Sequence, residues 1–243
     1  MDFRNVNLQG VNLRGANLKG AILAGIDFRG FDLQGVNLED ANIQGTRFGG
    51  ANLKGASLKG QNLRDVNFQD FILDGVNFES ADLNGASLKG ASLERANLVG
   101  VRLQGGMLHG AKLQNANIQG ANLSGSDLRG ADLRGAWLDR VILRDASLAF
   151  VKLEGAFLQG ANLEQANLYR SNLKGAKLDL ANLSHANLAY VQLRGAHLEG
   201  AKLQGTKLYY TDLSGAKLRE ANFRHANLTG ARLDLLWRSY VYR

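Results

Sequence analysis

The chain has 243 residues, with 29 Lys and Arg against 22 Asp and Glu, which gives a formal net charge of +7. It contains no Cys, so disulfides and thiolate metal sites are excluded. The longest apolar runs are only a few residues, far short of the ~20 that a membrane-spanning helix needs. The N-terminus, MDFRNVNLQG, has no basic start followed by an apolar stretch, so we expect no signal peptide and a cytoplasmic protein.

A strict five-residue period runs from Phe3 to Leu233. Every fifth residue, here called the centre of a unit, is apolar at all 47 positions: 39 Leu, six Phe and two Ile. Two residues before the centre the chain has Ala at 27 of the 47 positions. The residue just before the centre is usually Asn, Asp, Ser or a charged residue, and Gly is the commonest residue two after it. The segment 51–55, Ala-Asn-Leu-Lys-Gly, is one clean unit.

A five-residue period fits neither a straight helix nor a straight strand. On an α-helix a step of five turns about 500°, which would spread the leucines around every face. On a straight strand an odd spacing sends successive leucines to opposite faces. The pattern therefore predicts a chain that turns a corner in every unit. Ala and Leu then point inward, Asn points outward, and Gly lies at or near the corner, where a positive φ is often required.

The positions of the bulky residues predict four units per coil. Phe28, Phe48 and Phe68 are spaced by 20 residues, and so are Trp137 and Phe157. Bulky residues that stack on their own kind one coil further along explain this spacing, and a coil of 15 residues does not. We expect larger residues at inward positions to swell the coil locally: Ile26, Phe31 and Phe71.

The Ala-(Asn/Asp)-Leu-x-Gly unit resembles the repeat of the pentapeptide-repeat family over residues 1 to about 235. The resemblance implies an all-β fold, a right-handed quadrilateral parallel β-helix. The 47 units would make about twelve coils of 20 residues. We expect residues 1–235 to form this solenoid and residues 236–243 to form a separate C-terminal tail.

Solenoids need covered ends. The repeat begins at Met1, so we expect the first coil to be left open or covered by another chain. The C-terminal tail is apolar and aromatic, and it is expected to cap the last coil or to form a homodimer contact between terminal coils. The residues expected to make this cap or dimer contact are Leu235, Leu236, Trp237, Tyr240 and Tyr242.

Charge on the outer faces is mixed. We assign successive units in turn to faces A, B, C and D, with residues 1–5 on face A, and none of the four faces is strongly acidic. The family resemblance implies one further function, protection of DNA gyrase or topoisomerase from quinolones by mimicry of DNA. A mixed surface at +7 disfavours this function, because duplex DNA carries one negative charge per ~1.7 Å.

One outward-facing set on face B is rich in aromatic residues, and we call it the aromatic column. Its members are expected to lie along four successive coils: Phe150, Tyr169, Arg170, Tyr190, Tyr209 and Tyr210. Tyr and Arg are enriched at binding hot spots, so the column is the expected contact surface for a protein partner. Two alternatives remain open: a ladder of rings that only stabilises the solenoid, and stacking on nucleic acid.

A second column on face D would contain Trp137, Phe157, Lys177, His197 and Lys217, with Trp237 beyond them if the coil persists. For this column too, a purely stabilising ladder is an open alternative.

The sequence offers little for catalysis. The four histidines are expected to be ordinary surface residues, and no phosphate-binding loop stands out among the regularly spaced glycines. We therefore expect a non-enzymatic scaffold or spacer with a protein partner of unknown identity, no cofactor and no metal. A rod that uses its basic charge to bind nucleic acid or a membrane surface is a less favoured alternative.

Overall fold

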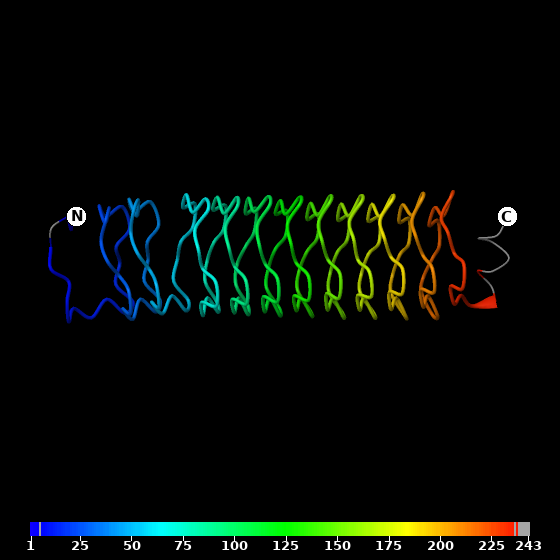
Figure 1. The fold of residues 1–243 in the computed structure, drawn as a ribbon, viewed down its shortest axis with the longest axis horizontal. Helices are drawn as coiled ribbons and strands as arrows, with labels where there is room; N and C mark the ends of the chain where they lie inside the picture. The colour runs from blue at the N-terminus through cyan, green and yellow to red at the C-terminus, as the bar shows by residue number, and fades with distance from the viewer. Residues whose placement is uncertain (5, 236, 238–243) are drawn as a thin grey trace.

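The computed structural model describes residues 1–4, 6–235 and 237. The chain winds into a long rod with the two termini at opposite ends (Figure 1). Most residues just before a centre form a parallel β-bridge with the residue 20 positions later, as in Asn117 to Trp137 and Trp137 to Phe157. The coil of 20 residues is thus confirmed. The described residues contain single bridges rather than longer strands, because each unit turns before a second ladder pair can form.

Every unit ends in a tight turn of one kind. In the turn of residues 133–136, the Ala136 N–H donates to the Leu133 carbonyl at 3.0 Å, and Gly135 has a φ of 65°. A positive φ at the third residue of a four-residue turn, without one at the second, is typical of type II and explains why Gly is favoured there. All corner residues from Gly10 to Gly230, at intervals of five, have a positive φ.

Backbone hydrogen bonds join neighbouring coils on all four faces. Between residues 81–100 and 101–120 there are 12 such bonds. On one face, the Leu83 N–H donates to Arg102 O at 2.7 Å, and the Arg102 N–H donates to Ala81 O at 3.0 Å. Because the same pattern recurs on each face, the coil satisfies its backbone groups without forming long strands.

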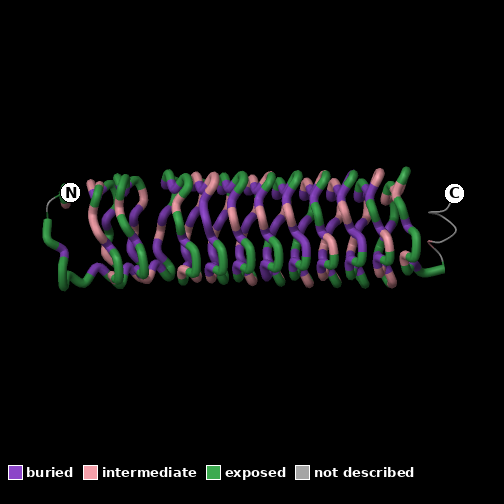
Figure 2. Tube along the Cα trace, in the orientation of Figure 1, coloured by how far each residue is buried: buried purple, intermediate pink, exposed green. Residues whose placement is uncertain are grey.

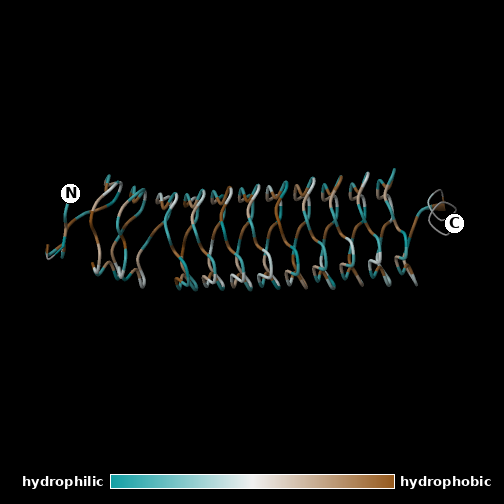
Figure 3. Cartoon of the chain, turned by 90° about the horizontal axis from the view of Figure 1, so that it is seen from above, coloured by the Kyte–Doolittle hydropathy of each residue, from teal (hydrophilic) through white to brown (hydrophobic). Residues whose placement is uncertain are grey.

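The core is a single stack of inward side chains that fills the axis of the rod. All centres from Leu8 to Leu233 are buried, except for Phe223, which is half-buried. Figure 2 shows these buried positions recurring along each coil between exposed corners, and Figure 3 shows the matching alternation of hydrophobic and hydrophilic residues. The convergence of the centres expected from the five-residue period is confirmed.

The outward Asn and Asp residues cap the turns. Asn117 Oδ1 accepts the backbone N–H of Gln119 at 3.2 Å, and the same bond between residues two apart recurs along the rod. Where Phe157 takes the place of Asn, the preceding coil supplies the acceptor, and Asp139 Oδ1 accepts the Gln159 N–H at 3.0 Å. The preference for Asn and Asp beside the centre follows from this need for a nearby acceptor.

The ladder opens beside the bulky inward residues, at which we expected local swelling of the coil. Beside Ile26, Phe31 and Phe71 the bridges to the preceding coil are missing among the described residues, so the structure accommodates these side chains where the ladder opens. Phe28 and Phe48 stack with ring centroids 5.8 Å apart, as their spacing predicts. The ring stack does not continue from Phe48 to Phe68 in the described part of the chain.

The described chain ends in helical backbone at Leu235 and Trp237. Trp237 packs against the core and donates its N–H to Asp234 O at 3.0 Å, whereas Leu235 is 83% exposed. The other residues expected in the C-terminal cap or dimer contact, Leu236, Tyr240 and Tyr242, lie outside the described residues. No helix in the part of the chain described here is long and apolar enough to span a membrane.

Candidate functional site

The aromatic column lies along one corner of the rod. Phe150, Arg170, Tyr190 and Tyr210 occupy the same corner in successive coils, with φ values of 61°, 56°, 60° and 53°. The left-handed region costs an ordinary side chain roughly 1–2 kcal/mol, and most corners avoid this cost with Gly. Bulky side chains at four successive strained corners are the kind of backbone outlier that motivates a functional hypothesis.

The rings of the column contact one another in a continuous series. Phe150 meets the edge of Tyr169 at a centroid distance of 5.9 Å, and Tyr169 meets Tyr190 at 5.8 Å. Tyr190 and Tyr210 are stacked at 5.2 Å. The Arg170 guanidinium lies 5.3 Å from the Tyr169 ring centroid and 5.6 Å from that of Tyr190, which gives the series one cation–π member.

Most of this aromatic surface remains open to solvent. Phe150 is 54% exposed, Tyr190 45% and Tyr210 58%. Tyr169 and Tyr209 are half-buried, and Tyr209 has no ring contact among those described. The structure therefore brings five of the six expected residues together by ring or cation–π contacts and places Tyr209 beside them in the chain.

Small residues give the rings room. Ala149 and Ala189 alternate along the coils with Tyr169, and both are buried. At the C-terminal end, the Tyr210 ring lies over Gly230, where an added Cβ would come within 2.5 Å of the ring. The sequence pattern alone did not single out these small residues. Gly230 could have been found from the sequence, because it lies 20 residues after Tyr210, at the end of the series of aromatic corners.

The second column, on face D, is less continuous. Trp137 and Phe157 are bridged neighbours, 50% and 41% exposed. Further along, Lys177 Nζ lies 2.8 Å from His197 Nε2. Burial, followed by the positive charges of Lys177 and Lys217, lowers the pKa of His197. This column therefore contains two exposed rings, Trp137 and Phe157, followed by the Lys177–His197 contact.

Exposed Leu180 is a residue that the sequence pattern did not single out. It lies at a corner with a φ of 61°, is 63% exposed and leans over Gly200. A search for apolar residues at corner positions would have found it.

The acidic groups of the surface are held by neighbouring cations. Asp27 Oδ2 lies 2.7 Å from Arg29 and 2.8 Å from Arg47. The Arg29 hydrogen bonds lower the pKa of Asp27 to about 2. Asp132 and Arg134 pair in the same way, at 2.7 Å. These ion pairs leave the outer faces mixed in charge.

The histidines belong to no metal-binding cluster in the part of the chain that the structure describes. No group of three or more His, Cys, Asp or Glu residues there could hold a metal ion. His185 lies over Gly205, and His225 Nε2 accepts from Arg224 Nε at 3.1 Å. The histidines thus have local structural surroundings.

A rod of 20-residue coils with a leucine axis and polar and aromatic side chains on its outside defines a four-sided β-solenoid. The chain belongs to the pentapeptide repeat family. The family model for pentapeptide repeats matches eight copies, in residues 72–106, 108–145, 146–184, 176–209 and 196–234. A second model, the pentapeptide repeat region, matches residues 1–78.

Solved structures in the same family resemble this chain. HetL, a pentapeptide repeat protein involved in heterocyst differentiation regulation in the cyanobacterium Nostoc sp. strain PCC 7120, is 34% identical over 90% of each chain, with a TM-score of 0.42. QnrB1, a plasmid-mediated fluoroquinolone resistance protein, is 20% identical over 76% of this chain and 95% of its own, with a TM-score of 0.51. The likeness to QnrB1 shows the fold, and implies the right-handed quadrilateral β-helix expected from the sequence. No curated protein matches the chain.

Proposed function

We propose that this protein is a non-enzymatic rod that binds a protein partner through the aromatic column. The observation that carries the proposal is the exposure of three rings at strained corners, Phe150, Tyr190 and Tyr210. A core position would stabilise such rings more than an exposed corner does, and exposed aromatic patches usually mark an interaction site. Tyr and Arg also dominate binding hot spots.

The rigidity of the column supports binding. The rings are already held by stacking and by Arg170, so little side-chain freedom remains to be lost on association. The corner lies on a backbone that is hydrogen-bonded from coil to coil, for example from the Tyr190 N–H to Tyr209 O at 2.8 Å. A preformed aromatic edge suits a partner with a shallow apolar groove.

DNA mimicry is not proposed for this chain. Fluoroquinolone resistance is a property of QnrB1, and the likeness to that protein concerns the fold. The present chain carries a net charge of +7, and its acidic groups, such as Asp27 and Asp132, are paired with arginines. A continuous acidic face is what such mimicry needs.

The proposal is tested by affinity capture from a native lysate with three forms of the protein. The test variant is Tyr190→Ala/Tyr210→Ala, and the matched control is Trp137→Ala/Phe157→Ala, which removes the other pair of exposed rings. We expect the wild type and the control to capture the same partner and the test variant to lose it. Equal capture by all three forms would refute the proposal, and retention on heparin with steep salt dependence would favour nucleic acid instead.

A further inference from the structure

The hydrogen-bonded ladder is interrupted at one place inside the rod. Only four backbone hydrogen bonds join residues 41–60 to residues 61–80, all of which are described, whereas 12 join residues 81–100 to residues 101–120. The bridges at Asn42, Arg47 and Asn52 to the following coil are missing from the described ladder. The wider spacing of these coils is visible in Figures 1 and 3. We call the facing segments 41–53 and 61–73 the joint.

The joint is hollow on its open side. One cavity of about 710 Å³ lies between residues 41–45 and residues 61–65. A second cavity, of about 290 Å³, lies between residues 50–52 and residues 69–72. Ile72 is 57% exposed beside the second cavity, although it occupies a bridging position. The separation of the coils therefore leaves real space at the surface.

Gln61 lies at the opened ladder and occupies one of its hydrogen-bond acceptors. It is the one Gln at an inward position two residues before a centre, where Ala is usual. Its buried Nε2 donates to Leu38 O at 2.7 Å and to Ala41 O at 3.1 Å. In the regular ladder the carbonyl equivalent to Ala41 O accepts a backbone N–H from the next coil. The Gln61 side chain has taken the acceptor that the Asn62 N–H would use.

Shorter polar residues at the same position leave the ladder intact. Thr211 Oγ1 donates to Leu188 O at 2.7 Å, and Ser171 Oγ donates to Leu148 O at 2.7 Å. Each of these acceptors lies 23 residues before the donor, as Leu38 lies before Gln61. The bridges beside Thr211 and Ser171 are formed. The joint therefore differs from the intact ladder beside Thr211 and Ser171 in the length of the inward polar side chain and not in its polarity.

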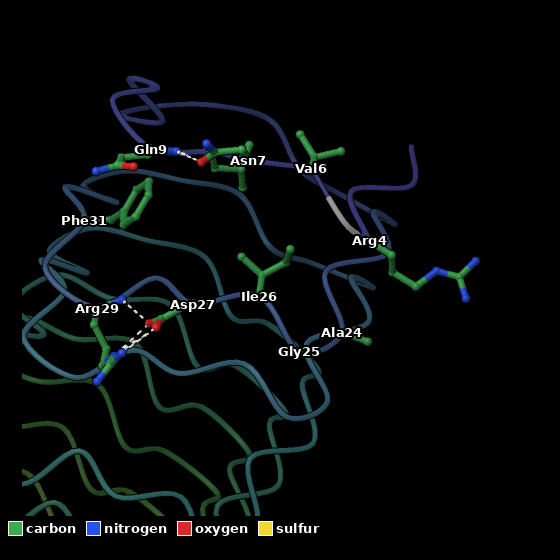
Figure 4. A pocket seen from close by; sticks show the side chains of 11 residues that line it. Arg4, Val6, Asn7, Gln9, Ala24, Gly25, Ile26, Asp27, Arg29 and Phe31 are labelled. Carbon is green, nitrogen blue, oxygen red and sulfur yellow. Dashed lines mark hydrogen bonds and ion pairs between the residues drawn. The ribbon is translucent and has the colours of Figure 1, made fainter.

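A bulky ring on the same coil accompanies Gln61. Phe71 is half-buried and meets the edge of Phe68 at a centroid distance of 5.2 Å. Phe31 meets Phe28 in the same way at 5.7 Å. The Phe31 coil also lacks its bridges to the preceding coil, at residues 7 and 12 of the described ladder, and a cavity of about 900 Å³ opens there (Figure 4). At two separate places in the rod, therefore, a coil with an inward Phe lacks bridges to the preceding coil.

The coils on either side of the joint remain attached along face D. The Leu58 N–H donates to Asn77 O at 2.8 Å, and the Gly60 N–H donates to Glu79 O at 2.9 Å. Lys59 Nζ and Glu79 Oε1 form an ion pair at 2.9 Å outside these bonds. The Gly55 N–H also donates to Asp74 O at 2.8 Å, at the corner between faces C and D. Attachment along one face and its adjoining corner, with separation elsewhere, is the arrangement of a hinge.

We propose that the joint is a hinge, at which residues 21–60 swing as one body against residues 61–235, and that Gln61 and Phe71 hold it open. The proposal goes beyond the proposed function, because the joint is remote in sequence from the aromatic column and uses none of its residues. Closing the joint would form the missing ladder bonds and bring Asn52 beside Ile72. The hinge therefore has two defined end states, an open one and a closed one with a continuous ladder.

Disulfide trapping tests the open state, because the chain has no native Cys to interfere. The test pair across the joint is Asn52→Cys/Ile72→Cys, and the matched control is Ile72→Cys/Ser92→Cys, a bridged pair on the same face. A disulfide needs Cα atoms about 4.4–6.8 Å apart. We expect the control to cross-link at least tenfold faster than the test pair under mild oxidation. Equal rates in the two pairs would overturn the proposal.

The roles of Gln61 and Phe71 are tested in the same assay. Gln61→Ala places the commonest inward residue at this position, so it is expected to fold, and Gln61→Ala/Phe71→Ala removes both obstacles. We expect the single variant to raise the cross-linking rate of the test pair and the double variant to bring it to the rate of the control. If neither variant changed the rate, these side chains would not hold the joint open.

Motion at the joint is measured by distances between spin labels. The pair Asp32→Cys/Lys112→Cys crosses the joint, and the control Lys112→Cys/Gln192→Cys spans the same 80 residues of face C without crossing it. Four coil steps of about 4.8 Å give about 19 Å for the control. We expect a longer and at least twofold broader distance distribution for the first pair, narrowing in the Gln61→Ala/Phe71→Ala background. Equally narrow distributions in the two pairs would refute the hinge.

Discussion

Tyr190 and Tyr210 lie one coil apart with ring centroids separated by 5.2 Å and planes inclined by 18°. Both side chains start from corners with a positive φ, where Gly is the usual residue. The two rings make favourable contacts with each other, with Tyr169 and with Arg170, each of about 0.5–1.5 kcal/mol. Their two left-handed corners cost roughly 1–2 kcal/mol each. Because these favourable and unfavourable contributions to stability nearly cancel, removing both rings should impair partner binding without unfolding the rod.

Replacement of both rings by glycine should have little effect on the stability of the rod. In Tyr190→Gly/Tyr210→Gly the lost stacking is offset by relief of the left-handed backbone, so the free energy of unfolding should change by less than about 1 kcal/mol. Urea denaturation followed by circular dichroism measures this change. A loss of more than about 3 kcal/mol would show that the rings serve to hold the solenoid together.

Leu180 should be a source of backbone strain. Its φ of 61° disfavours a branched side chain, and 63% of its surface is exposed. We expect Leu180→Gly to raise the free energy of unfolding by about 1 kcal/mol. The reverse change, Gly120→Leu, lies in the same corner register, where an added Cβ meets nothing within 4 Å, so it should cost a similar amount through the backbone alone. Chemical denaturation measures the free energy of unfolding of both variants. A change of the same sign in Leu180→Gly and Gly120→Leu would contradict this explanation.

The buried hydroxyl of Thr211 should contribute to stability through one hydrogen bond. Its Oγ1 donates to Leu188 O at 2.7 Å, and the side chain is fully buried. Thr211→Val keeps the shape and removes the donor, so we expect a loss of about 1 kcal/mol. The control Thr229→Val removes an exposed hydroxyl that bonds only Asn227 and should cost less than about 0.5 kcal/mol. Similar thermal shifts in the two variants would argue against the buried bond.

Asp27 should remain ionised well into the acid range. The Arg29 hydrogen bonds lower its pKa from 3.8 to about 2. Because the folded-state pKa lies below the unfolded value, this group stabilises the fold above about pH 4, and the contribution is lost as the pH falls towards 2. In Arg29→Gln we expect the pKa to rise towards 3.8, less than completely because Arg47 remains 2.8 Å away.

Carboxyl carbon shifts in an NMR titration would report the pKa of Asp27 directly. Arg14→Gln is the control, since Arg14 faces Asp32 at 3.7 Å rather than Asp27. If the pKa of Asp27 were unchanged in Arg29→Gln, the Arg29 hydrogen bonds would not be the cause of its lowered value.

Much of the fold could be predicted from the sequence because the rule is local. Each unit needs an inward Leu, a small inward partner and a turn residue, and these requirements recur every five residues from Phe3 to Leu233. The 20-residue coil also left a visible trace in the spacing of Phe28, Phe48 and Phe68. The structure confirms the coil through its parallel bridges.

The aromatic column was predictable in its membership and not in its geometry. The 20-residue register placed Phe150, Arg170, Tyr190 and Tyr210 on one corner. Whether rings lie edge to face or stacked depends on rotamers that neighbouring coils decide together. The sequence pattern could not specify these contacts.

The sequence by itself determined the coil, its axis and its corners, because backbone turns and hydrophobic burial act within a few residues of one another. Only the tertiary structure decided where successive coils bond and where they separate. Gln61 meets Ala41 O across a coil boundary, and the competition between its side chain and the Asn62 N–H for one carbonyl exists only after the chain has wound back on itself.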